Sequence, residues 1–171
     1  MKLSLALTAA LLALVLPAGF AHAASATAPK DFVTTAIKGD ISEVKIGQLA
    51  EQQGSTAAVR DFGKTLVTDH TNAEDQAKTT AKQINVTPPD QPTAEAQDEY
   101  DKLAKLKGTA FDNEFAQYMV KDHQQDIATF KDEAAAKNGP ASTLAEQQLP
   151  VLQKHLQMAQ SIASKQQAKT P

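Results

Sequence analysis

The sequence predicts an all-α protein, an up-down-up-down four-helix bundle with an extra short helix in its middle connection. Three observations lead to this expectation. Most of the chain is rich in Ala, Gln, Lys, Asp and Leu, a composition typical of amphipathic helices. Apolar residues recur at alternating steps of three and four, which gives each long segment one apolar face. Glycine and proline gather at a few points and divide the chain into four long segments and one short segment.

The first two helices are expected over residues 31–53 and 56–84. Gly54 separates them, and Ser55 is expected to cap the second helix, because its side-chain oxygen can accept from a free backbone N–H. The inner faces are expected to carry, in the first helix, Phe32, Ala36, Gly39, Glu43, Ile46 and Ala50, and in the second helix, Val59, Phe62, Leu66, His70, Ala73 and Ala77.

The connection that follows contains Pro88, Pro89 and Pro92, which favour an extended backbone. A short helix is expected after them, over residues 94–106. Thr109 and Asp112 then have the spacing of a capping box, which predicts that the third long helix begins there.

The third long helix is expected to end at Asn138-Gly139-Pro140, and the fourth to continue to Lys165. Pro150 either kinks this last helix or marks its true start. Two tight turns and one longer connection predict two antiparallel hairpins packed face to face. Similar segments in the two hairpins, "LVTDHT" at 66–71 and "MVKDHQ" at 119–124, support this pairing.

The first 23 residues have the features of a signal peptide: one lysine, a continuous apolar stretch and a final Ala-His-Ala. Cleavage is expected after Ala23, leaving a linker at 24–30, a bundle domain at 31–165 and a disordered tail at 166–171. Pro17 and Gly19 interrupt the apolar stretch and argue against a membrane anchor, and no later segment could span a bilayer. The chain has no cysteine, including the one that a lipoprotein needs. A periplasmic or secreted location is therefore expected.

Composition also excludes several classes of function. The net charge is −3 and Arg60 is the only arginine, whereas nucleic-acid binding requires a concentrated basic surface. Without cysteine there is neither a thiolate metal ligand nor a cysteine nucleophile. The serine-hydrolase pattern GxSxG is absent as well.

Three histidines follow the signal peptide, and they are predicted to lie at one depth in the bundle. His70, His123 and His155 are each about 16 residues from the glycine of the nearest turn, or roughly 24 Å at ~1.5 Å per residue. His70 and His123 also lie in the apolar stripes, four residues after Leu66 and Met119. Their rings are therefore expected to point inward.

Glu43 lies in the inner stripe of the first helix, and its side chain leans toward the level of the histidines. Three imidazoles and a carboxylate could bind one Zn, Fe or Cu ion. Asp69 and Asp122, each directly before a histidine, are possible hydrogen-bond partners of such ligands. The predicted metal site therefore consists of Glu43, His70, His123 and His155.

Two alternatives to this interpretation stay open. The histidines could be neutral core residues that hold the helices in register, in which case the bundle could bind other macromolecules of the envelope through a helix face. A metalloenzyme with an open coordination position is the third hypothesis, ranked last because no general base is marked out. An enzymatic role is thus less favoured than a binding role.

Four segments resemble the successive signatures of an exported bacterial family, domain of unknown function 4142: "FVTTAIKGDISEVKIGQLA", "VRDFGKTLVTDHT", "FDNEFAQYMVKDHQQDIATFKDEA" and "LPVLQKHLQMA". The resemblance implies a ferritin-like bundle, an exported location and no established activity. Glu43, His70, His123 and His155 occupy the family's recurrent Glu and His positions. Members are often labelled outer membrane proteins, so peripheral association with the envelope is a further possibility.

The chain departs from ferritin-like metal enzymes at two positions. Those enzymes place Glu-x-x-His on two helices, and each glutamate helps to bridge two irons. Here the residues three before His70 and His123 are Val67 and Val120. The sequence therefore argues against a di-iron ferroxidase.

Overall fold

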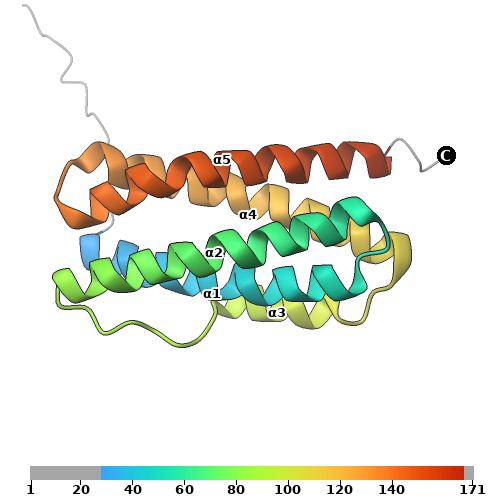
Figure 1. Cartoon of the computed structure of the whole chain (residues 1–171), viewed down its shortest axis with the longest axis horizontal. Coiled ribbons are helices and arrows are strands. Elements are labelled where there is room, and N and C mark those ends of the chain that lie inside the picture. The colour runs from blue at the N-terminus through green and yellow to red at the C-terminus, as the bar shows by residue number, and fades with distance from the viewer. Residues whose placement is uncertain (1–27, 168–171) are drawn as a thin grey trace, which may run out of the picture.

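The computed structural model describes residues 28–167 and shows an all-α protein (Figure 1). No β-strand occurs within these residues. Five helices follow one another along the chain: α1 (Pro29–Gln53), α2 (Ala57–Gln83), α3 (Ala94–Leu103), α4 (Gly108–Ala136) and α5 (Pro140–Gln167). The expected class, a bundle of four long helices with a short helix in the middle connection, is confirmed. Among these helices, none combines the length and apolarity needed to cross a membrane.

The directions of the helices differ from the expected up-down-up-down order. Figure 1 shows the α1–α2 turn and the α4–α5 turn at opposite ends of the bundle, so that the order is up-down-down-up. The middle connection explains the difference. Its extended stretch, at ~3.3 Å per residue, and the ten residues of α3 together run back along most of the length of α2. Helix α4 consequently begins at the end where α2 begins.

The capping residues also differ from the predicted ones. Thr56, rather than Ser55, caps α2, and its Oγ1 accepts from the backbone N–H of Val59. Asp112 forms no capping box; its carboxylate instead accepts hydrogen bonds of 2.8–3.0 Å from the backbone and hydroxyl groups of Ser55 and Thr56. This buried aspartate fastens the α1–α2 turn to α4, which is possible because both lie at one end of the bundle.

Helices α1 and α2 approach each other closely at two glycines. A Cβ atom on Gly63 would lie 2.6 Å from the carbonyl oxygen of Gly47, and one on Gly47 would lie 2.9 Å from that of Gly63. Both distances are too short for a side chain. The two glycines thus allow the backbones of the first hairpin to pack directly on each other.

The helix ends differ from the expected ends by two or three residues. Helix α1 begins at Pro29 instead of residue 31, α3 ends at Leu103 instead of residue 106, and α5 continues to Gln167 instead of residue 165. Pro150 lies inside α5 on an exposed face and does not mark its start. The predicted signal peptide and residues 168–171 of the predicted tail lie outside the described residues.

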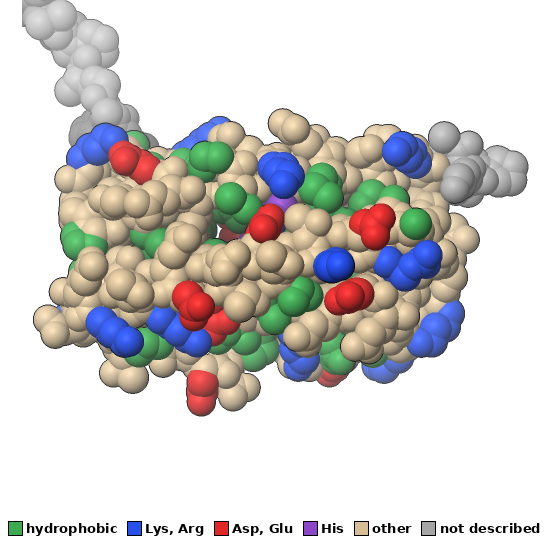
Figure 2. Space-filling view, in the orientation of Figure 1, with side chains coloured by type: hydrophobic (Ala, Val, Ile, Leu, Met, Phe, Trp, Pro, Cys, Tyr) green, Lys and Arg blue, Asp and Glu red, His purple; other side chains and the backbone are tan. Residues whose placement is uncertain are grey.

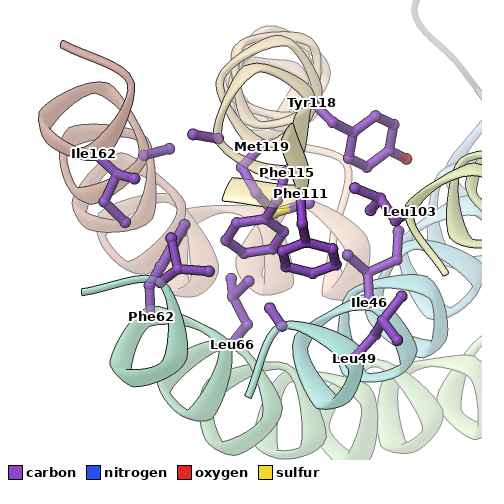
Figure 3. Close-up of a cluster of buried hydrophobic side chains, with 14 of the residues drawn as sticks. Ile46, Leu49, Phe62, Leu66, Leu103, Phe111, Phe115, Tyr118, Met119 and Ile162 are labelled. Atoms are coloured by element: carbon purple, nitrogen blue, oxygen red, sulfur yellow. The ribbon is translucent and has the colours of Figure 1, made fainter. Parts of the chain in front are cut away.

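The buried apolar side chains form two clusters, one toward each end of the bundle. The first, at the α1–α2 turn, includes Phe62, Leu66, Phe111, Phe115 and Met119 (Figure 3). The second, at the α4–α5 turn, contains Phe32, Ile37, Phe130 and Leu144 among others. In each long helix, ionisable residues lie between the segments that supply these clusters. A polar layer therefore crosses the middle of an otherwise apolar core.

Candidate metal centre

Each of the four long helices contributes to the polar layer. Glu43 on α1 and the three histidines on α2, α4 and α5 are buried; His123 and His155 are 0% exposed, and His70 is 4% exposed. Carboxylates surround the rings. The members of the layer are Asp40, Glu43, Asp69, His70, Asp122, His123, Asp126 and His155.

The three imidazole rings meet in the core. Their centroids lie 6.0 Å apart for His70 and His123, 5.2 Å for His70 and His155, and 5.4 Å for His123 and His155. One nitrogen from each ring lies within 4.8 Å of the other two. This spacing is close to what metal–nitrogen bonds of ~2.0–2.1 Å require of ligand atoms around one ion.

In each imidazole ring, one nitrogen faces a hydrogen-bond acceptor; we call it the outer nitrogen and the second nitrogen of the same ring the inner one. Nδ1 of His70 lies 2.8 Å from Oδ1 of Asp40, and Nδ1 of His123 lies 3.0 Å from the carbonyl oxygen of Met119. Nε2 of His155 lies 2.9 Å from Oδ2 of Asp69. A carbonyl oxygen or an ionised carboxylate accepts but does not donate, so each of these nitrogens carries the ring proton when Asp40 and Asp69 are ionised.

The inner nitrogens are consequently left with lone pairs. Nε2 of His70 is buried and has no hydrogen-bond partner within residues 28–167. Nε2 of His123 and Nδ1 of His155 face each other at 3.4 Å. If both outer protons are in place, no proton lies between these two nitrogens and their lone pairs repel. A bound cation would turn this unfavourable arrangement into three metal–ligand bonds.

Burial keeps the rings neutral at physiological pH. Loss of hydration lowers the pKa of His70 and of His155 to about 4, and it lowers that of His123, with a further contribution from His70, to about 3. Protons therefore compete weakly for the inner nitrogens. Neutral imidazole is the form that binds a metal ion.

The opposite side of the layer is acidic. Oxygens of Glu43 and Asp122 lie within 4.8 Å of a ring nitrogen of His123 and of each other. Burial, followed by the charge of Asp122, raises the pKa of Glu43 well above its usual value, and burial also raises the pKa of Asp40 and of Asp126. Oε2 of Glu43 and Oδ2 of Asp40 have no hydrogen-bond partner within residues 28–167. Burial thus favours the neutral forms of these carboxyl groups in the metal-free protein, and their unpaired oxygens remain as potential acceptors or ligands.

The structure brings the three predicted histidines together, whereas Glu43 forms a second group with Asp122 and His123 only. The two Asp-His pairs also differ. Asp69 contacts His155 on α5 rather than its neighbour His70. Asp122 lies 4.0 Å from Nδ1 of His123, which is beyond hydrogen-bond distance, and lies near Glu43. Identical dipeptides therefore have different roles, which only the packing of the helices determines.

Sequence reasoning missed Asp40 and Asp126. Asp40 lies one turn before Glu43, a spacing that places both carboxylates on one side of α1 and could have identified it. The histidines share a level for a reason other than the expected one. The two turns lie at opposite ends, but a residue about 16 positions from either turn is near the midpoint of helices of 27–29 residues.

The fold and the layer define an all-α bundle protein with a buried histidine and carboxylate centre. Residues 16–162 match the family described as Domain of unknown function (DUF4142). The chain belongs to this family, as its sequence signatures indicated.

A solved structure has a similar fold. The crystal structure of a DUF305 fragment from Deinococcus radiodurans superimposes with a TM-score of 0.71 at 13% sequence identity, covering 82% of this chain and 98% of that chain. At this identity the similarity concerns the fold alone. No curated protein matches the sequence.

Proposed function

We propose that the protein binds one transition-metal ion in the polar layer. The proposed ligands are one nitrogen each of His70, His123 and His155, and the nearest group with a carboxylate is the one that Glu43 forms with Asp122 around His123. The observation that supports this most strongly is that one nitrogen of each of the three rings lies within 4.8 Å of the other two, while another nitrogen of each ring faces a hydrogen-bond acceptor. Metal-binding histidines generally donate their other N–H to a carboxylate or carbonyl in this way.

The donor set favours divalent ions of intermediate hardness. Imidazole and carboxylate suit Zn²⁺, Fe²⁺ or Cu²⁺. A sulfur ligand would favour Cu⁺. The side chain of Met119, however, belongs to the apolar cluster, and only the backbone carbonyl oxygen of Met119 contacts His123. A bound dication would also favour the ionised form of Glu43, whose pKa burial and the charge of Asp122 raise in the metal-free protein. The protein would hold this ion outside the cytoplasm, as the N-terminal sequence predicts.

The test is a metal titration of protein purified without a histidine tag, using Zn²⁺, Co²⁺, Cu²⁺ and Fe²⁺ separately. One ion per chain is expected, measured by elemental analysis and calorimetry. His123→Ala should abolish binding, because it removes the central ligand. Glu43→Gln should weaken binding, whereas Glu133→Gln should not, because Glu133 is an equally buried glutamate that contacts Ser142 outside the layer.

Failure to bind any of the four ions would contradict the proposal and favour the structural role of the histidines. In that case His123→Ala would alter only the stability of the bundle. Thermal unfolding of each variant, measured without metal, separates these two results.

A further inference from the structure

A cleft between α2 and α5 leads from the surface to the polar layer. It has a volume of about 240 Å³, and its inner end is lined by Asp40, Asp69 and His70. A second cavity of about 440 Å³ lies farther along the same two helices and shares Gln76 and Gln147 with the first. Figure 2 shows this face hollowed, with a histidine and an acidic side chain visible near the hollow. The cleft thus connects solvent with a metal ligand and with two partners of the ligands.

The chemistry of the cleft suits a cation. Among the described residues that line it, none is Lys or Arg. Its walls carry the amide side chains of Asn72, Gln76, Gln147 and Gln148, whose oxygens can replace part of the water around an ion. Oδ2 of Asp40 is buried at the inner end without a hydrogen-bond partner in the described chain. A cation that enters would meet amide and carboxyl oxygens along the way to His70.

Two other sides of the histidines are covered by the described residues. Phe62 packs against His155 with ring centroids 6.0 Å apart, and His123 and His155 are fully buried. The cavity that reaches His70 from the side of Phe32 and Phe130 has a volume of only about 40 Å³. That is room for about one water molecule. Of the two described cavities that reach His70, the α2–α5 cleft is the one with room for a hydrated ion.

Besides the contact between His155 and Asp69, a second hydrogen bond joins the two helices at the cleft. Nε2 of Gln148 donates to the carbonyl oxygen of Ala73 over 3.1 Å, joining α5 to α2. Gln148 is 5% exposed and its side chain is flexible, so a change of rotamer could open this contact without unfolding either helix. The side chain of Gln148 thus narrows the cleft at a point where it can move aside.

From these observations we infer that the α2–α5 cleft is the passage by which the metal ion enters and leaves the folded protein. The inference rests on the proposed metal binding and extends it. The ion is then exchangeable cargo that the protein takes up and releases, rather than a permanent structural component. Asp40 and Asp69 meet the ion at the inner end of the passage, before it reaches the three nitrogens.

Kinetics test this inference through Gln147, which is exposed and lines both cavities. Loading of Co²⁺ is followed by its visible absorbance after rapid mixing, and release is followed after dilution into excess chelator. Gln147→Trp should slow loading and release equally, by about tenfold, or ~1.4 kcal/mol of added barrier. Because an obstruction raises the barrier in both directions, the dissociation constant should stay within about twofold.

Gln157→Trp is the matched control, since Gln157 is an exposed glutamine of the same helix that lines neither cavity. It should leave both rates at the wild-type values. A second variant, Gln147→Lys, adds a positive charge to the passage and should slow loading by about threefold at low salt and less at high salt. It provides an independent test if the tryptophan variant fails to fold.

Two results would overturn the inference. Wild-type rates in both Gln147 variants would exclude this passage. Release no faster than global unfolding, measured by hydrogen exchange on the same protein, would mean that the ion leaves only when the bundle opens. A wild-type protein that binds no metal at equilibrium contradicts the proposed function instead, so the two failures are distinguishable.

Discussion

Two neighbouring regions of the core are buried to the same degree: the aromatic cluster near the α1–α2 turn and the polar layer beside it. They differ in whether their buried groups find favourable partners. Phe62, Phe111 and Phe115 are 0% exposed and pack with ring centroids 5.7 and 6.1 Å apart. In the layer, buried atoms of Asp40, Glu43 and His70 have no hydrogen-bond partner within the described chain. Burial therefore stabilises the first region and costs free energy in the second.

This difference is consistent with the proposed metal binding. A core that served stability alone would be better filled by apolar side chains of similar volume. The two regions should accordingly respond in opposite ways to substitution: changes in the aromatic cluster should affect the free energy of unfolding, and changes in the layer should affect metal affinity.

The largest expected effect is that of Phe115→Ala. Removing a fully buried ring leaves a cavity and should lower the free energy of unfolding by about 3–5 kcal/mol, measured by urea denaturation. The fraction that stays folded should bind metal with nearly wild-type affinity, because the histidine ligands and their partners remain. A large loss of intrinsic affinity would show that the two regions are not separable.

The next effect concerns the pH dependence of stability in the metal-free protein. The pKa of His70 falls from 6.5 to about 4 on folding, so between these values the unfolded state binds more protons and stability falls as the pH falls. Wild type and His70→Gln should therefore differ in this slope. The stability advantage of wild type should shrink by roughly 3 kcal/mol between pH 7 and pH 4 and stay flat above pH 7.

Urea denaturation at several pH values in the presence of a chelator measures this difference. Other titrating groups of the layer are common to both proteins and largely cancel. Parallel pH profiles would show that the His70 ring takes up a proton in the folded state, contrary to its burial.

The smallest effect separates the two Asp-His pairs. Asp69→Asn should reduce metal affinity by about 10- to 100-fold, because the carboxylate that accepts from Nε2 of His155 fixes the orientation of that ring. Asp122→Asn leaves the hydrogen bond of His123 to Met119 intact and should not weaken binding through ring orientation. Calorimetry on both variants tests this asymmetry; equal losses would mean that Asp122 also contacts the ion.

Much of the fold was predictable because it depends on local pattern. The periodicity of three and four defined the long helices, and Gly54 and Gly139 marked the turns. The direction of α4 was not predictable in this way, since it depends on how far residues 84–107 travel along the bundle. Asp112 illustrates the same limit: its spacing from Thr109 suggested a local cap, but the Ser55 and Thr56 groups of another helix hold it instead.

The residues of the polar layer were predictable in part, and their contacts were not. Counting residues placed His70, His123 and His155 at one level, and the stripe of α1 placed Glu43 near them. The partners of the rings came from other helices: Asp40 for His70 and Asp69 for His155. No count along one helix gives such pairings.

The sequence by itself determined which residues face the core and at what height, because both follow from the fixed rise and rotation of an α-helix. Only the tertiary structure decided which way each helix runs, which carboxylate meets which ring, and which nitrogen keeps its lone pair. Those features depend on side chains from different helices approaching within hydrogen-bond distance. Such an approach is set by packing across the bundle and not by spacing along the chain.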